Sequence, residues 1–183
     1  MGKLQELQKL QNIIVSCSAC KKVGSGKLVF GEGSPNAKVI FVGEAPGKKE
    51  AESGRPFIGR SGQLLRSIIR SIGLKEKDVY ITSPVKYLPR KGTPSRQEII
   101  HSHTHFVKQL EIIQPKIIVL LGKTAVYAIL GVDIPVLKDH GKTYEKNGWK
   151  IFVTLHPAAV LRFPKYKSLF ESDFKKIKKI SKN

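Results

Sequence analysis

The chain is poor in cysteine, in acidic residues and in long apolar runs, and each of these scarcities excludes a class of protein. It has 183 residues and two cysteines, too few for a framework of disulfide bonds. No apolar stretch approaches the ~20 residues of a membrane span, and residues 1–10 lack the apolar core of a signal peptide. We therefore expect an intracellular, cytoplasmic protein that does not bind membranes.

Acidic residues are outnumbered by basic ones. The chain has 14 Asp and Glu against 33 Lys and Arg, which gives a formal net charge of +19. An excess of this size on a chain long enough for one domain favours a polyanionic partner, most simply nucleic acid. A solubilising surface, or the lysine- and isoleucine-rich composition of some heat-adapted proteins, would also account for the excess.

Apolar runs alternate with amphipathic stretches along the chain. The apolar runs predict strands over residues 38–43, 79–82 and 116–121 and a hairpin over residues 144–152. Helical periodicity predicts helices over residues 1–12, 61–72, about 95–113, 124–130 and 165–180. This alternation indicates an α/β fold: a single three-layer α/β/α domain over residues 1–183, with a mostly parallel central sheet. We expect the protein to be a monomer.

Two loops that follow predicted strands carry the side chains best suited to chemistry. The segment Gly43-Glu44-Ala45-Pro46-Gly47 follows one strand and His156 follows another, at the edge where open α/β sheets bind ligands. A ligand or water can approach the Glu44 carboxylate closely, Phe57 can stack on a planar ring, and His156 can donate to an oxygen that gains negative charge. Taken singly, a phenylalanine such as Phe57 is more often a core residue, a His-Pro pair such as that at His156 is mostly a turn, and Glu44 could be an acid at a helix N-terminus. Their combination favours breaking a bond to a nucleobase.

The motifs around these residues resemble the uracil-DNA glycosylase superfamily, and within it the thermostable, iron–sulfur-containing family 4 enzymes. The resemblance runs from about Cys17 to Phe174, nearly the whole chain. An ordered set of motifs at these spacings is far more specific than any one of them. The matching segments are Gly43-Glu44-Ala45-Pro46-Gly47, Gly54-Arg55-Pro56-Phe57-Ile58-Gly59-Arg60-Ser61-Gly62, Val79-Tyr80-Ile81-Thr82, Gln114-Pro115-Lys116-Ile117-Ile118-Val119-Leu120-Leu121-Gly122 and His156-Pro157-Ala158.

The resemblance implies a monofunctional DNA glycosylase of base-excision repair. Such an enzyme flips a deaminated base, here expected to be uracil, out of single- or double-stranded DNA and hydrolyses its N-glycosidic bond. Glu44 and His156 would be catalytic, with Glu44 near the water and His156 at a carbonyl oxygen of the leaving base. Ala45 stands where some branches of the superfamily carry an aspartate, so leaving-group stabilisation would carry much of the rate. The implied base-binding residues are Gly43, Ala45, Pro46, Gly47, Phe57 and Ser83, with Phe57 stacked on the base.

The resemblance also implies which residues contact DNA. The segment that begins at Ala158 would enter the minor groove, with Val160 and Leu161 as its apolar wedge. Without the resemblance, this segment is equally a plain helix start. Because bound cations release counterions from DNA, affinity is expected to fall with salt. The expected phosphate contacts are Lys86, Arg90, Lys91, Arg162 and Lys165.

A first departure from the family 4 pattern concerns its metal cofactor. Family 4 enzymes hold a 4Fe–4S cluster with four cysteines. Here Cys17 and Cys20 match the first pair, but Tyr87 and Ser102 stand at the third and fourth positions. Two thiolates do not make the usual shell, so we expect the cluster to be absent.

Histidines next to Ser102 make a Cys₂His₂ zinc site conceivable. On a helical projection, however, His103 falls inside the apolar stripe, whereas His101 and His105 face away from it. Core packing is therefore expected for His103 and solvent exposure for His101 and His105. The sequence favours a disulfide or free thiols at the cysteine pair over zinc.

A second departure is Ser83, which stands where family 4 enzymes usually carry an asparagine that reads the base. An amide matches both N3–H and O4 of uracil, whereas a hydroxyl is shorter and has one proton. The substrate could then be another deaminated base, such as hypoxanthine or xanthine, or the chain could be a DNA-binding paralogue with little catalysis. A nucleotide-binding enzyme is disfavoured, because neither G-x-x-x-x-G-K-[ST] nor G-x-G-x-x-G occurs.

Overall fold

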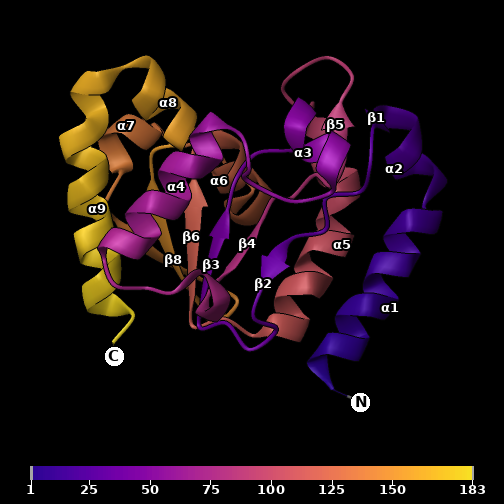
Figure 1. The fold of residues 1–183 in the computed structure, drawn as a ribbon, viewed down its shortest axis with the longest axis horizontal. Helices are drawn as coiled ribbons and strands as arrows, with labels where there is room; N and C mark the ends of the chain where they lie inside the picture. Colours follow the sequence, from indigo (N-terminus) through magenta and orange to yellow (C-terminus); the bar gives the residue numbers. More distant parts are fainter. Residues whose placement is uncertain (1, 183) are drawn as a thin grey trace.

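A six-stranded sheet forms the centre of the protein (Figure 1). The computed structural model describes residues 2–182, so the ends of the predicted domain, residues 1 and 183, lie outside the described residues. From edge to edge the strands are β2 (Glu32–Gly33), β4 (Tyr80–Thr82), β3 (Val39–Val42), β6 (Ile117–Leu121), β8 (Trp149–Thr154) and β7 (Thr143–Lys146). The inner four are parallel and the two edge strands antiparallel, which confirms the predicted α/β class.

The order of the parallel strands creates a crevice at the carboxyl end of the sheet. The chain runs from β3 to β4, crosses back to β6 on the other side of β3, and continues to β8. The strand order therefore reverses between β3 and β6. In open α/β sheets ligands bind outside the carboxyl ends of the strands at such a switch point.

Helices cover both faces of the sheet. One face carries α4 (Arg60–Ser71), α8 (Pro157–Arg162) and α9 (Lys167–Ile180), and the other carries α5 (Arg96–Ile113) and α6 (Lys123–Leu130). The remaining elements are α1 (Lys3–Ser16), α2 (Ser18–Val23), α3 (Lys48–Ser53), α7 (Val136–Asp139), the 3₁₀ turns η1 (Glu76–Asp78) and η2 (Pro164–Tyr166), and the small antiparallel pair β1 (Gly24–Ser25) and β5 (Leu88–Pro89). No helix within residues 2–182 is long and apolar enough to cross a membrane.

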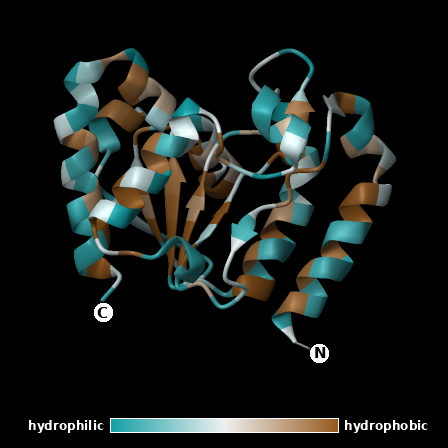
Figure 2. Cartoon of the chain, in the orientation of Figure 1, coloured by the Kyte–Doolittle hydropathy of each residue, from teal (hydrophilic) through white to brown (hydrophobic). Residues whose placement is uncertain are grey.

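The inner strands are buried on both sides, which explains why they form unbroken apolar runs. Along β3, Val39 and Phe41 pack against the layer of α4 and α9, and Ile40 and Val42 pack against the layer of α5 and α6. Figure 2 shows the consequence: the central strands β3 and β6 are hydrophobic along their whole length, while the helices are hydrophobic mainly on the sides that face the sheet. The predicted strands therefore match the observed ones within one or two residues.

Helix α5 is covered on more than one side. Ser95 caps it, and a capping box with Glu98 fixes its start. Its apolar stripe faces the sheet through residues such as Phe106 and Leu110. A second side of α5 lies against α1 and α2, which run beside it on the right of Figure 1. That side is therefore partly covered: His105 is half-buried there, while His101 remains exposed.

Candidate active site

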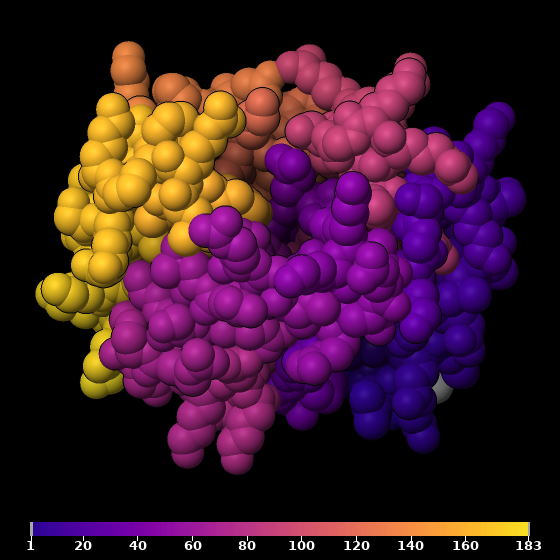
Figure 3. All heavy atoms as spheres, turned by 45° about the horizontal axis from the view of Figure 1, so that its top comes forward, coloured from indigo at the N-terminus to yellow at the C-terminus, as the bar shows by residue number. Residues whose placement is uncertain are grey.

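A cavity of about 330 Å³ opens at the carboxyl edge of the sheet. This volume lies at the small end of the range for small-molecule sites, roughly 300–1,000 Å³. Figure 3 brings this edge forward and shows the surface hollowed between the yellow C-terminal part, the magenta segment and the pink loop. We call this cavity the base pocket. The predicted site residues that line it are Glu44, Ala45, Pro46, Gly47, Phe57, Ser83 and His156.

Glu44 lies at the point where the strand order reverses. It follows β3, and Thr124 at the start of α6 donates a hydrogen bond from Oγ1 to Glu44 Oε2 at 2.7 Å. The carboxylate is half-buried, so one neighbour orients it while the cavity still reaches it. This geometry suits a carboxylate that positions water. Thr124 was not predicted, because nothing in a lone threonine signals a contact 80 positions away.

Phe57 is held in a backbone conformation that non-glycine residues rarely adopt. Its φ is 52°, in the left-handed region. Glu50 holds the backbone that follows, because its Oε1 accepts from Ile58 N at 2.9 Å and from Gly59 N at 2.8 Å. Strain of this kind persists only where surrounding structure determines it, and it recurs at ligand sites. Glu50 was also missed from sequence, since its partners are backbone amides that carry no sequence signal.

Further contacts fix Phe57 from other directions. Arg66 donates from Nε to Phe57 O at 3.0 Å and from Nη2 to Pro56 O at 2.9 Å. A Cβ at Gly43 would lie 2.4 Å from the Phe57 ring, and one at Gly62 would lie 2.0 Å from Phe57 O. Both glycines therefore make room for the aromatic segment. The ring is positioned as a rigid wall of the base pocket.

His156 lies across the base pocket from Phe57, with ring centroids 6.0 Å apart and planes tilted by 34°. Its Nδ1 accepts from Ala158 N–H at 3.2 Å, which assigns the proton of the neutral ring to Nε2. Burial lowers the pKa of His156 below its usual value, and attraction to the Glu44 carboxylate only partly opposes this shift. The ring is therefore a neutral donor, suited to an oxygen that becomes negative.

Ser83 lies in the wall of the base pocket and already uses its proton. Its Oγ donates to Val85 O at 2.8 Å, and the side chain is buried. Toward a ligand, the hydroxyl therefore has only lone pairs to offer. It can accept from a base N–H but cannot also donate to a carbonyl oxygen, as an asparagine would.

The prediction that Lys86 contacts phosphate is wrong. The side chain is only 2% exposed, and its Nζ donates to Phe30 O at 3.0 Å, to Thr82 Oγ1 at 2.6 Å and to Gln109 Oε1 at 2.6 Å. Burial holds the pKa of Lys86 well below its usual value. This lysine ties the loop after β4 to α5 and has no surface to present to DNA.

The predicted minor-groove wedge is half wrong. Val160 is 4% exposed and packs into the core beneath α8, whereas Leu161 is 42% exposed. Only Leu161 is available as a wedge. The other predicted DNA contacts lie at the surface in the described structure: Ala158, Arg90, Lys91, Arg162 and Lys165.

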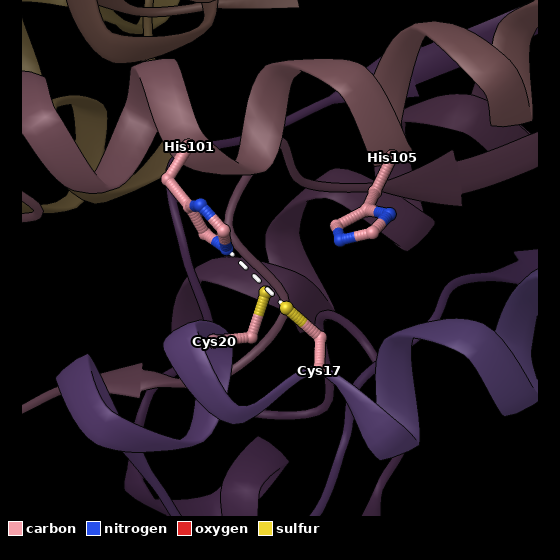
Figure 4. A group of neighbouring side chains, drawn as sticks. All are labelled: Cys17, Cys20, His101 and His105. Atoms are coloured by element: carbon pink, nitrogen blue, oxygen red, sulfur yellow. Dashed lines mark hydrogen bonds between the residues drawn. The ribbon is translucent and has the colours of Figure 1, made fainter.

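The cysteine pair meets two histidines, contrary to the prediction. Cys17, Cys20, His101 and His105, here called the Cys/His cluster, place one ligand atom each so that all lie within 4.8 Å of one another (Figure 4). Cys17 Sγ is 3.4 Å from His101 Nε2, and both thiols are free. The helical projection was correct in turning His101 and His105 away from the sheet. The expected solvent exposure is confirmed for His101, but His105 is half-buried, because α1 and α2 pack on that side of α5.

His103, expected in the core, is instead exposed, with Nδ1 2.9 Å from Ala128 O. The other family positions do not supply ligands of the expected kind. Tyr87 is 7% exposed, packs close to Gly24 at the end of α2, and carries a phenol in place of a thiol. Ser102 is 5% exposed and carries a hydroxyl. The four-thiolate shell that a 4Fe–4S cluster uses is therefore not present in this donor set.

Comparison with known proteins agrees with the geometry. The family model described as the uracil DNA glycosylase superfamily matches residues 30–178. A Type-4 uracil-DNA glycosylase of Archaeoglobus fulgidus is 38% identical over 93% of this chain and 92% of its own length. One from Sulfurisphaera tokodaii is also 38% identical, over 97% and 86%. A Type-5 uracil-DNA glycosylase of Pyrobaculum aerophilum is 29% identical over 80% of each chain.

Proposed function

Because the chain belongs to the uracil DNA glycosylase superfamily, we propose that it is a monofunctional DNA glycosylase that removes uracil during base-excision repair. The main support for the proposal is that Glu44, Phe57 and His156 line the same cavity. The relatives whose names state this activity match nearly the full length of the chain. Residues 1–183 would act as a single domain.

The base pocket suggests how the reaction proceeds. A flipped base would stack on Phe57, while His156 Nε2–H donates to a carbonyl oxygen of the base. As the bond between C1′ and the base nitrogen breaks, its electron pair leaves with the base, and the donor stabilises the negative charge that spreads to that oxygen. Water held by Glu44 forms the new bond to C1′, and the proton it loses is finally carried by the released base. The sugar–phosphate backbone stays intact.

DNA binding would involve the surface around the base pocket. Arg90 and Lys91 lie on the loop after β5, Arg162 is the last residue of α8, and Lys165 lies in η2, so cations flank the cavity on two sides. Leu161 would enter the duplex where the base leaves it. The net charge of +19 supports attraction to DNA.

Ser83 favours a second candidate substrate class. With its proton donated to Val85 O, the hydroxyl accepts but does not donate. N3–H of uracil satisfies it, and so does N1–H of hypoxanthine or xanthine. Discrimination among deaminated bases should therefore be weaker than an asparagine would give.

A lesion panel tests both candidates. Single- and double-stranded oligonucleotides carrying uracil, hypoxanthine or xanthine would be incubated with the protein, and the released base identified by mass. We expect uracil release by the wild type, loss of release in Phe57→Ala and His156→Ala, and no change in His103→Ala, whose side chain lies outside the base pocket. DNA binding without release of any base would instead identify a binding-only paralogue.

A further inference from the structure

The Cys/His cluster lies outside the base pocket and takes no part in the proposed reaction. Its ligands come from two elements, with Cys17 and Cys20 at the start of α2 and His101 and His105 on α5. Figure 4 shows both imidazoles directed from α5 toward the two sulfur atoms. Two soft sulfurs and two imidazole nitrogens on rigid helices form a complete four-ligand set.

The spacings within each pair place the ligands side by side. The cysteines are separated by two residues, and the histidines lie four apart on one helix, so each pair shares one face. These are the C-x₂-C and H-x₃-H spacings of structural zinc sites. Here the two halves are far apart in the chain and are brought together by the packing of α2 on α5.

The size of the cluster fits one ion. Around tetrahedral zinc, bonds of about 2.3 Å to sulfur and about 2.0–2.1 Å to nitrogen place neighbouring ligand atoms roughly 3.3–3.8 Å apart. The four ligand atoms here all lie within 4.8 Å of one another, and Cys17 Sγ lies 3.4 Å from His101 Nε2. A four-iron cluster spreads its metal atoms over the corners of a cube and needs its ligands farther apart.

We propose that Cys17, Cys20, His101 and His105 bind a single Zn²⁺ ion in place of the iron–sulfur cluster of the family. Tetrahedral S₂N₂ donor sets are typical of zinc, and two thiolates neutralise its charge. All four positions are filled by protein, so the ion is structural and has no open site for water or substrate. It fastens α2 to α5, and through β1 it supports β5, whose Leu88 lines the base pocket.

The test measures metal content directly. Full-length protein expressed with both zinc and iron available would be analysed for zinc, iron and acid-labile sulfide. We expect one zinc per chain and neither iron nor sulfide. Cys17→Ser and His101→Ala should each lose most of the zinc, while the matched control His103→Ala, on the same helix, should retain it. Stoichiometric iron with sulfide would overturn the proposal.

A second measurement remains decisive even if the ligand variants fold poorly. Wild-type protein stripped with a chelator under reducing conditions would be titrated with Co²⁺. We expect the visible spectrum of tetrahedral cobalt with thiolate charge-transfer bands, saturating at one equivalent and abolished by Zn²⁺. Absence of such bands, or of zinc uptake by the stripped protein, would refute a four-ligand site, as would a disulfide between Cys17 and Cys20 that persists under reductant.

Discussion

In the base pocket, hydrogen bonds from neighbouring residues fix the positions of the active side chains. In the Cys/His cluster, four metal-ligand side chains lie close together, but within residues 2–182 no comparable set of hydrogen bonds from neighbouring residues fixes them. In the base pocket, Thr124 orients Glu44 and Glu50 fixes the backbone beside Phe57. In the cluster, by contrast, the ligand side chains contact one another: Cys17 Sγ lies 3.4 Å from His101 Nε2, and Cys17 is hydrogen-bonded to Cys20. The pocket is therefore preorganised for a ligand that comes and goes, while the cluster, under our proposal, would depend on a resident cation for its stability.

Removing the cation should have the largest effect on folding. If free zinc is about a thousandfold above its Kd, binding adds about 4 kcal/mol to the free energy of unfolding. For a chain of this size that amounts to roughly 8–16 °C in Tm, at about 2–4 °C per kcal/mol. Thermal melts with and without a chelator measure it. The same chelator should leave the melt of the Cys17→Ser variant unchanged, and an equal shift in that variant would contradict the assignment.

Removing the donor of the base pocket should have the largest effect on the rate. His156→Ala deletes a preorganised hydrogen bond to the leaving base, which costs about 10²–10³-fold in kcat for such donors. Single-turnover release of uracil measures this loss. Zinc content should stay at the wild-type value, because His156 is not in the Cys/His cluster. A rate within threefold of wild type would remove His156 from the mechanism.

Loosening the aromatic segment should have a smaller effect. Glu50→Ala leaves the half-buried amides of Ile58 and Gly59 without their acceptor, and losing such a hydrogen bond to a charged group costs about 1.5–3 kcal/mol. Phe57 would then sample other positions, and we expect about a tenfold lower kcat/KM, since 1.4 kcal/mol corresponds to tenfold. Glu50→Gln keeps a carbonyl oxygen at the same place and should recover most of the activity. Equal loss of activity in both variants would show that the negative charge of Glu50 matters, and not the hydrogen bonds that it accepts from the backbone.

His156 should also make stability depend on pH. Burial lowers its pKa in the folded protein, so above the ordinary histidine value of about 6.5 both states are neutral and its contribution is complete. As the pH falls below that value, the unfolded chain binds the proton first and the folded state loses stability. Urea unfolding of wild type and His156→Gln across this range isolates the effect. The wild type should weaken more on acidification, and the opposite sign would contradict a lowered pKa.

The sequence predicted well those strands and site residues whose positions depend on residues adjacent in the chain. The runs that became β3 and β6 are apolar because both faces are buried, and Glu44 and His156 follow strands directly, so chain position alone placed them at the carboxyl edge. Glu50 and Thr124 could not be found in this way, since each acts on a distant backbone or side chain. Lys86 was predicted to contact phosphate because it is a lysine in a basic loop. The prediction failed because, in the folded chain, its Nζ is buried against Thr82 and Gln109.

The Cys/His cluster was missed for a different physical reason. A helical projection divides a helix into one buried face and one solvent face, and that division holds only when a single layer covers the helix. Helix α5 is covered by the sheet on one side and by α1 and α2 on another. His101 and His105 lie on that second, partly covered side, where His105 is half-buried and His101 exposed, and no pattern within α5 reveals that the cysteines pack beside them.

The smallest predicted effect separates surface cations near the base pocket from those far from it. Each phosphate contact contributes about one unit to the slope of log affinity against log salt. Arg162→Ala, at the C-terminal end of α8, should therefore lower that slope by about one and weaken binding similarly for all sequences. Lys116→Ala is the matched control, because Lys116 is exposed at the opposite, amino-terminal end of β6. Titration of labelled DNA at several salt concentrations measures both. Equal slopes for the two variants would mean that the general charge of the chain, and not the surface around the base pocket, holds the DNA.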